Sequence, residues 1–198
     1  MEIGDLINDR YRLIEKIGQG GMGQVVKAQD IILARTVAIK LLHAETSPTV
    51  VQRFQKEARV TAKLKHPNIV EVLDFGATES GDLFLVMEFL PGRSLSDLIC
   101  KPEDLDIDYA IWLAIEICQG LKNAHEHGIL HRDLKLSNVI LVESEDNDPQ
   151  VKILDFGLAK LEEEDQKLTQ TGAAIGTPLY MSLDTASGKT RTNKDGNF

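Results

Sequence analysis

The chain has 198 residues, of which 42% are hydrophobic and 5% are aromatic. This length can bury one core of moderate size or two small ones, so we expect one domain with room for two lobes. The formal net charge is −9. A negative surface repels nucleic-acid backbones and anionic membranes, and we therefore expect no nucleic-acid partner and no membrane binding.

The redox state and the cellular location follow from other features of composition. Cys100 and Cys118 both lie in apolar stretches, which predicts buried, reduced thiols rather than a disulfide framework. The N-terminal ten residues contain no apolar signal-peptide core, and the longest apolar stretch, AIWLAIEIC, is too short to span a bilayer. These features predict a cytoplasmic protein.

The first half of the chain is rich in strand-like sequence. Residues 11–43 contain three short β-branched runs separated by glycine-rich or polar turns, which predicts consecutive antiparallel strands. A helix should begin at Ser47 and Pro48, an N-cap and first-turn pair, and continue with apolar residues at helical spacing to Leu64. Two more strand-like runs follow, at residues 69–76 and 83–90.

Helical patterns dominate after a turn predicted at Pro91–Ser94. The longest covers residues 107–126 and is followed by Gly128, a typical helix terminator. We therefore predict an N-terminal lobe at 11–90, a second lobe at 91–190 and a polar tail at 191–198.

Two motifs in the first lobe are individually weak signals. Residues 18–25 read G-x-G-x-x-G-x-V and lie between two strands, which favours a flap that lays backbone N–H groups over phosphates. A flexible hairpin is the alternative. Lys40 ends the apolar strand that contains Val37, Ala38 and Ile39. A functional lysine and an ordinary surface lysine at a strand end are both compatible with this pattern.

Two further motifs follow in the second lobe, His131-Arg132-Asp133-Leu134-Lys135-Leu136-Ser137-Asn138 and Asp155-Phe156-Gly157. In this order behind the glycine segment and Lys40, they resemble the catalytic loop and magnesium motif of eukaryotic-type protein kinases of the serine/threonine branch. HPNIV, VMEFLPG and LTQTGAAIGTPLYMS resemble the bacterial members of that family. The resemblance covers residues 11–189.

The resemblance implies an α+β, bilobal protein-kinase-like fold, with an antiparallel β N-lobe that holds one helix and a partial, mainly helical C-lobe. It implies transfer of the γ-phosphoryl group of ATP, bound with Mg²⁺, to serine and threonine hydroxyls of protein substrates. Lys40 would bind the α- and β-phosphates and form an ion pair with Glu57 of the following helix. A glutamate on the exposed side of an amphipathic helix is the alternative for Glu57.

The second lobe would supply the remaining catalytic groups. Asp133 would orient the substrate hydroxyl or accept its proton, and Lys135 would stabilise the transferred phosphoryl charge. Asn138 and Asp155 would hold magnesium through oxygen atoms. Thr177 resembles the threonine that hydrogen-bonds the catalytic aspartate in this branch.

The resemblance also implies an adenine pocket between the lobes. Val25 and Ala38 would form its roof, Ile140 its floor and Met87 its back, while ordinary core positions remain the alternative for all four. The complete predicted nucleotide site comprises Ile17, Gly18, Gly20, Gly23, Val25, Ala38, Lys40, Met87, Glu88, Leu90 and Ile140, with Glu88 and Leu90 acting through main-chain groups.

Residues 157–177 would form the activation segment. A phosphate on Thr169 or Thr171 would pair with Arg132 and order this segment, whereas loop threonines without a regulatory role are the alternative.

The sequence departs from the family pattern after Thr177. Leu136 replaces a common proline of the catalytic loop, and Ser182-Leu183-Asp184 stands where the family has Ala/Ser-Pro-Glu. Helix 107–126 carries apolar residues on nearly every side and therefore expects partners on more than one face. We expect a truncated kinase domain that exposes this helix for a partner or for self-association. Three hypotheses follow: a kinase, impaired or not by truncation; a nucleotide-binding pseudokinase or interaction module; and a non-functional remnant.

Overall fold

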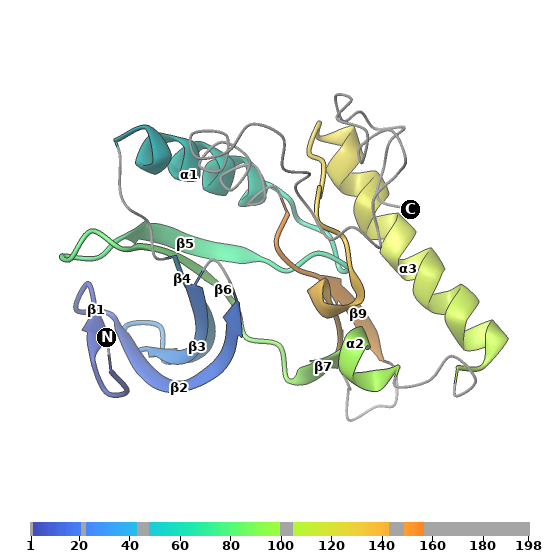
Figure 1. Ribbon diagram of the computed structural model, residues 1–198, viewed down its shortest axis with the longest axis horizontal. Coiled ribbons are helices and arrows are strands. Elements are labelled where there is room, and N and C mark those ends of the chain that lie inside the picture. The colour runs from blue at the N-terminus through green and yellow to red at the C-terminus, as the bar shows by residue number, and fades with distance from the viewer. Residues whose placement is uncertain (1, 21–22, 43–47, 100–104, 143–148, 157–198) are drawn as a thin grey trace. The chain divides into compact units, whose positions relative to one another are not determined.

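The computed structural model describes residues 2–20, 23–42, 48–99, 105–142 and 149–156 (Figure 1). The chain forms two compact units. One consists of Met1–Lys63 and Glu71–Leu90, and the other of Leu64–Val70 and Pro91–Phe198. Each unit is taken in turn below.

The first unit is built on a six-stranded antiparallel sheet with the strand order β1-β2-β3-β4-β6-β5. The runs predicted as strands from residue 11 onward are confirmed. The two-residue strand β1, which is too short to show a period, was not predicted. The strands are β1 (Leu6–Ile7), β2 (Tyr11–Gly20), β3 (Gly23–Asp30), β4 (Arg35–Leu42), β5 (Val72–Ala77) and β6 (Leu83–Glu88).

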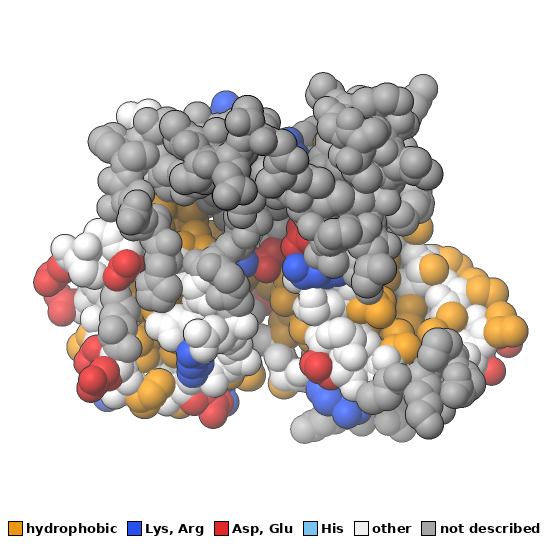
Figure 2. Space-filling model, in the orientation of Figure 1, with side chains coloured by type: hydrophobic (Ala, Val, Ile, Leu, Met, Phe, Trp, Pro, Cys, Tyr) orange, Lys and Arg blue, Asp and Glu red, His pale blue; other side chains and the backbone are white. Residues whose placement is uncertain are grey.

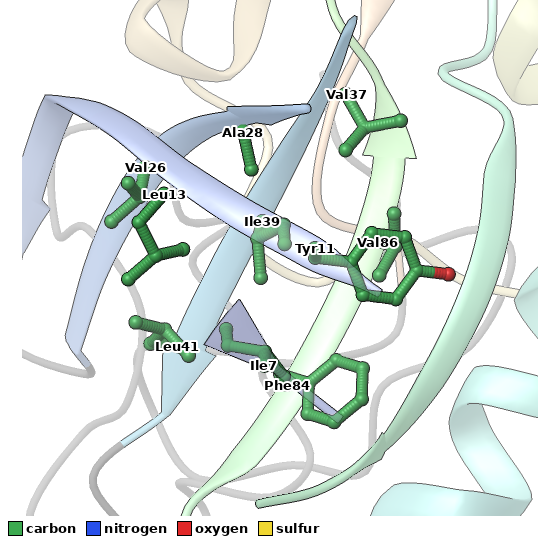
Figure 3. Packing of buried hydrophobic residues seen from close by; sticks show 10 residues of the cluster. All are labelled: Ile7, Tyr11, Leu13, Val26, Ala28, Val37, Ile39, Leu41, Phe84 and Val86. Atoms are coloured by element: carbon green, nitrogen blue, oxygen red, sulfur yellow. The ribbon is translucent and has the colours of Figure 1, made fainter. Parts of the chain in front are cut away.

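Side-chain alternation gives the sheet two different faces. On one face, Val37, Ile39 and Leu41 of β4 pack into a hydrophobic cluster, shown close up in Figure 3. The cluster comprises Ile7, Tyr11, Leu13, Val26, Ala28, Val37, Ile39, Leu41, Phe84 and Val86. The intervening residues of β4, which include Ala38 and Lys40, are also buried, so this central strand is covered on both sides.

Helix α1 (Pro48–Thr61) covers part of the face that carries Lys40. Its buried Phe54 meets Phe75 of β5 edge to face, with ring centroids 6.3 Å apart. Phe75 pairs with Leu85, and Leu85 pairs with Lys40. Because directly paired residues share a face, α1 and Lys40 lie on the same side of the sheet.

An ion cluster around the buried Asp30 holds the start of the sheet together. Asp30 is fully buried and accepts two hydrogen bonds from Arg10, at 3.2 and 2.8 Å. Arg10 also contacts Asp74 at 3.2 Å, and the Tyr11 hydroxyl donates to the same Asp74 oxygen at 2.7 Å. The hydrogen bond from Arg10 lowers the pKa of Asp30, whereas burial raises the pKa of Tyr11 and keeps it protonated. The cluster therefore ties β2, β3 and β5 together.

The second unit contains a three-stranded antiparallel sheet, β7-β8-β9, formed by Gly92–Ser94, Val139–Val142 and Gln150–Ile153. The prediction of a turn at 91–94 was wrong for residues 92–94, because β8 supplies a pairing partner that local sequence does not reveal. Gly92 permits the close approach, since a Cβ there would overlap the Leu141 carbonyl. Ser94 then caps the short helix α2 (Leu95–Leu98).

Helix α3 (Ile107–Glu126) confirms the predicted boundaries of the long helix. Asp106 is its N-cap and accepts hydrogen bonds from the main-chain N–H groups of Asp108 and Tyr109. Its inner face joins a cluster beside the sheet that contains Leu95, Leu113, Val139, Leu141 and Val151.

The outer face of α3 is apolar and exposed. Ile107, Ile111 and Ile115 have 74%, 52% and 51% of their surface exposed, and hydrophobic side chains gather over this helix in Figure 2. Cys118 lies on the same exposed face, so the prediction of a buried thiol is wrong for this residue. Cys100 lies outside the described residues. Within the described ranges, no helix combines the length and apolarity needed to cross a membrane.

The segment 64–70 extends the sheet of the second unit. Ile153 donates its N–H to the Asn68 carbonyl at 2.9 Å, and Val70 donates to Ile153 at 3.0 Å. The Asn68 side chain donates to Glu116 of α3 at 2.7 Å and to the Val151 carbonyl at 3.0 Å. Gly120 leaves room for this contact, because a Cβ there would lie 3.1 Å from the Asn68 carbonyl oxygen. The end of β9 is therefore fixed from two sides.

Replacing Asp30 by alanine tests the ion cluster. Loss of the buried carboxylate leaves the Arg10 guanidinium, 28% exposed, without this partner, and we expect a loss of roughly 2–4 kcal/mol in the free energy of unfolding. Urea denaturation followed by circular dichroism measures it, with the exposed Glu79→Ala as control. Since Arg10 lowers the pKa of Asp30, the difference should be present at neutral pH and shrink as the pH falls below about 3.9. Equal stability of Asp30→Ala and wild type at pH 7 would contradict the assignment.

Candidate active site

The glycine motif forms a hairpin between two strands. Gly20 pairs with Gly23 at the tip, and Gly18 pairs with Val25. Gly23 has φ of 148°, and a Cβ at this position would overlap the Leu41 carbonyl, so the backbone requires glycine. Residues 21–22 lie outside the described part. The hairpin fits the predicted flap and excludes the strand-to-helix turn of a dinucleotide fold.

Four predicted nucleotide-site residues share one face of the first sheet. Val25 pairs directly with Lys40, and Ala38 pairs directly with Met87. This face is opposite to the hydrophobic cluster of Figure 3. Ala38, Lys40 and Met87 are buried and Val25 is half-buried. The fold therefore gathers these side chains on one face of the sheet, in two neighbouring rows.

The remaining predicted residues of the first unit lie at its borders. Ile17 is 46% exposed in β2, directly before Gly18. Glu88 ends β6 and donates its main-chain N–H to the Glu71 carbonyl at 3.0 Å, and Leu90 follows it, half-buried. Glu57 belongs to α1, which covers the face of Lys40, but its side chain lies outside the described part of the structure.

In the second unit, the catalytic-loop residues come together around Asp133. Lys135 Nζ lies 2.7 Å from Asp133 Oδ2. Asn138 Nδ2 donates to the Asp133 carbonyl at 2.8 Å and lies 3.4 Å from its Oδ2. Asn138 ends a short 3₁₀ turn, Leu136–Asn138, closed by its N–H bond to the Lys135 carbonyl. A carboxylate, an ammonium and an amide are thus held in one loop.

The buried side chain of His131 holds this loop in place. Its ring is fully buried, Nε2 lies 2.6 Å from the Leu154 carbonyl, and Nδ1 lies 3.3 Å from the Asp133 main-chain nitrogen. Burial lowers the pKa of His131, so the ring is neutral, with Nε2–H donating to Leu154 and Nδ1 accepting from Asp133. The ring also packs against Phe156, with centroids 4.7 Å apart.

No functional role was predicted for His131 or Phe156, although both stand inside the quoted motifs. In the sequence, the available signal for such a role was the closeness of these two residues to Asp133 and Asp155. The packing of these two rings joins the motifs physically.

Asp155 follows β9 in a left-handed backbone conformation, with φ of 61°, and Arg132 has φ of 69°. Such conformations cost about 1–3 kcal/mol each for residues other than glycine and need support from their surroundings. The Leu154 N–H donates to the Asn138 carbonyl at 2.8 Å, which brings the chain at Asn138 beside Asp155. Ile140 is half-buried and pairs with Lys152, on the face of β8 opposite to Val139 and Leu141.

The oxygen donors of Asn138 and Asp155 fit a magnesium ion. Because Asn138 Nδ2 is engaged with Asp133, Oδ1 is the atom of this amide that would be available to a metal ion. Among the described residues, no three His, Cys, Asp or Glu side chains form a metal site of their own. Magnesium usually takes one or two protein oxygens together with water and substrate phosphates, which matches this pair.

Several predicted residues lie outside the described ranges, namely Thr169, Thr171 and Thr177, together with the Ser182-Leu183-Asp184 segment.

Comparisons with known proteins agree with this geometry. The family described as "Protein kinase domain" matches residues 11–194. Serine/threonine-protein kinase pkn3 of Myxococcus xanthus is 38% identical over 192 residues, covering 94% of this chain and 35% of that protein. The probable serine/threonine-protein kinase PknB of Lactococcus lactis is 42% identical, covering 97% of this chain and 30% of that protein. The chain thus spans about a third of the length of these curated relatives.

Among solved structures, the kinase domain of Mycobacterium tuberculosis PknI superimposes with a TM-score of 0.72 at 24% identity. The match covers 98% of this chain and 72% of that one, and it confirms the predicted protein-kinase fold. From the family match, the bacterial relatives and the fold together, we conclude that the chain belongs to the protein kinase domain family.

Proposed function

We propose that this chain transfers the γ-phosphoryl group of ATP, bound with Mg²⁺, to serine or threonine hydroxyls of protein substrates. The observation that carries the proposal is the catalytic loop, in which Lys135 lies 2.7 Å from Asp133 and Asn138 is bonded to the Asp133 main chain. The relatives named as serine/threonine-protein kinases support the choice of substrate class.

Each loop residue has a distinct chemical task in this proposal. The Asp133 carboxylate orients the substrate hydroxyl and takes its proton. The Lys135 ammonium, beside that carboxylate, offsets the negative charge on the transferred group. The family resemblance also implies a role for Thr177, which lies outside the described residues, as a partner of Asp133. Phosphoryl transfer depends mainly on the positioning of the reacting groups and on the neutralisation of charge. In this proposal the loop residues supply both.

The nucleotide-binding residues of each unit have their own task in this proposal. Asn138 and Asp155 hold magnesium, which neutralises phosphate charge when bound. Lys40, paired with Glu57, contacts the α- and β-phosphates. The glycine hairpin covers these phosphates with main-chain N–H groups through Gly18, Gly20 and Gly23. In the first unit, the adenine lies against Ile17, Val25, Ala38 and Met87, and it bonds main-chain groups of Glu88 and Leu90. Because the proposed reaction consumes ATP, we propose that this domain acts in the cytoplasm.

A second candidate function comes from α3. Its outer face presents Ile107, Ile111 and Ile115, each at least half exposed, in a line at helical spacing. Contiguous exposed apolar surface is typical of protein interfaces. We propose that this face contacts protein, including a second copy of the chain, so that the domain acts as an interaction module as well as a kinase.

Replacing Asp133 by asparagine tests the catalytic proposal. We expect phosphate incorporation into a generic basic protein to fall about 10²–10⁴-fold, because the group that accepts the proton is lost. Incorporation of radiolabelled phosphate measures it, and Asp108→Asn on exposed α3 is the control for loss of one carboxylate. MgATP should still raise the melting temperature of the variant. Wild-type incorporation that does not depend on Asp133 would reject the proposal.

The buried His131 predicts a pH dependence of stability. Because burial lowers its pKa in the folded state, protons bind more readily to the unfolded chain below about pH 6.5. The free energy of unfolding should therefore decrease as the pH falls from 7.5 to 5.5, and less so for His131→Gln. Denaturant titrations at both pH values measure this. An NMR titration of His131 with a pKa at or above its ordinary value would contradict the structural reading, even if the variant does not fold.

The double variant Ile111→Glu and Ile115→Glu tests the interaction face. Sedimentation velocity over a range of protein concentrations should show self-association of the wild-type chain and a monomeric double variant, because two charges disfavour burial of the face. Lys63→Glu, at an exposed lysine of the first unit, is the control for added negative charge away from this face. A wild-type chain that stays monomeric at every concentration would speak against self-association through α3.

A further inference from the structure

Lys27 makes two contacts that the proposed function does not use. Its Nζ lies 4.9 Å from the centroid of the Phe89 ring and 3.0 Å from Glu15 Oε1. The lysine side chain is 29% exposed. It therefore joins three separate segments of the first unit: β2, β3 and the chain directly after β6.

The register of the sheet places Lys27 in one of the two rows of predicted nucleotide-site residues. Glu15 pairs with Lys27, Lys27 with Ala38, and Ala38 with Met87. Directly paired residues share a face, so Lys27 lies on the face that also carries Lys40. Phe89 follows two residues after Met87 in the chain, directly beyond the end of β6.

Phe89 lies between the two residues proposed to recognise adenine through their main chain. Glu88 is already anchored by Glu71, since its N–H donates to the Glu71 carbonyl at 3.0 Å and its carboxylate accepts the Glu71 N–H at 2.9 Å. Lys27 supplies a second anchor, on the Phe89 ring. A cation over an aromatic ring is attracted by the ring quadrupole, and the salt bridge to Glu15 limits where the ammonium can go.

We propose that Lys27 is a positioning residue for nucleotide binding. Through Phe89 it fixes the main chain at Glu88 and Leu90 in the geometry that adenine requires. This inference rests on the proposed function, and it concerns the base of the nucleotide rather than its phosphates. A preorganised main chain lowers the cost of ordering on binding, so loss of Lys27 should weaken adenine binding specifically.

The test compares Lys27→Met, which keeps length and apolar surface but removes the charge, with Lys27→Arg, which keeps a cation for the ring. Lys63→Met, an exposed lysine of the same unit, is the control for loss of one charge. We expect Lys27→Met to raise the KM for MgATP about three- to tenfold with unchanged kcat. Inhibition by inorganic tripolyphosphate should stay unchanged. Lys27→Arg should restore the wild-type KM, and Phe89→Leu should reproduce the effect of Lys27→Met.

Calorimetric binding of adenosine, which lacks phosphates, gives a readout that does not depend on catalysis. Lys27→Met should weaken it by the same factor as it raises KM. Wild-type KM and adenosine affinity in Lys27→Met, or an equal loss of tripolyphosphate inhibition, would overturn the inference while leaving the kinase assignment intact. A wild-type chain that binds adenosine but transfers no phosphate would instead overturn the proposed function, and the adenosine series would still decide the role of Lys27.

Discussion

The carbonyl and N–H of Leu154 hold the catalytic loop and the magnesium motif together. The carbonyl accepts from His131 at 2.6 Å, and the N–H donates to the Asn138 carbonyl at 2.8 Å. His131 in turn accepts from the Asp133 main chain. One peptide segment at the end of β9 thus sets the positions of Asp133, Asn138 and Asp155. The left-handed conformations of Arg132 and Asp155 persist because these bonds fix the chain on either side.

In the first unit, a single sheet packs the hydrophobic core with one face and carries the proposed binding surface on the other. Alternation along β3, β4 and β6 sends one set of side chains into the hydrophobic cluster of Figure 3 and the other onto the opposite face, which carries Val25, Ala38 and Lys40. The ion cluster around Asp30 and the packing of α1 through Phe54 hold the sheet at its border and on its functional face, respectively. Lys27 links this opposite face to the chain that follows β6.

Local pattern in the sequence was sufficient for many of the elements. Strand-like runs between turns located five strands, and helical spacing followed by a terminating glycine located α3. The strand at Gly92–Ser94 was missed because its partner β8 lies far along the chain. The exposure of Cys118 was misjudged because α3 is apolar on several faces, and period alone does not tell which face is covered. Contacts such as His131 with Leu154 and Lys27 with Phe89 join residues that are distant in the sequence. A local motif therefore does not predict them. The catalytic, nucleotide-binding and metal-binding roles of the site residues, including Glu57 and Thr177, stay predictions.

The central claim is that the loop around Asp133 and the chain at Asp155 together form the site that binds the metal–nucleotide complex. Replacing magnesium by paramagnetic manganese in the presence of ATP, with backbone amide resonances as the readout, tests this most directly. The account predicts that resonances of residues 133–138 and 153–156 broaden together at low manganese concentration, while those of the exposed face of α3 stay sharp. Broadening of neither segment, or of only one of them, would contradict it.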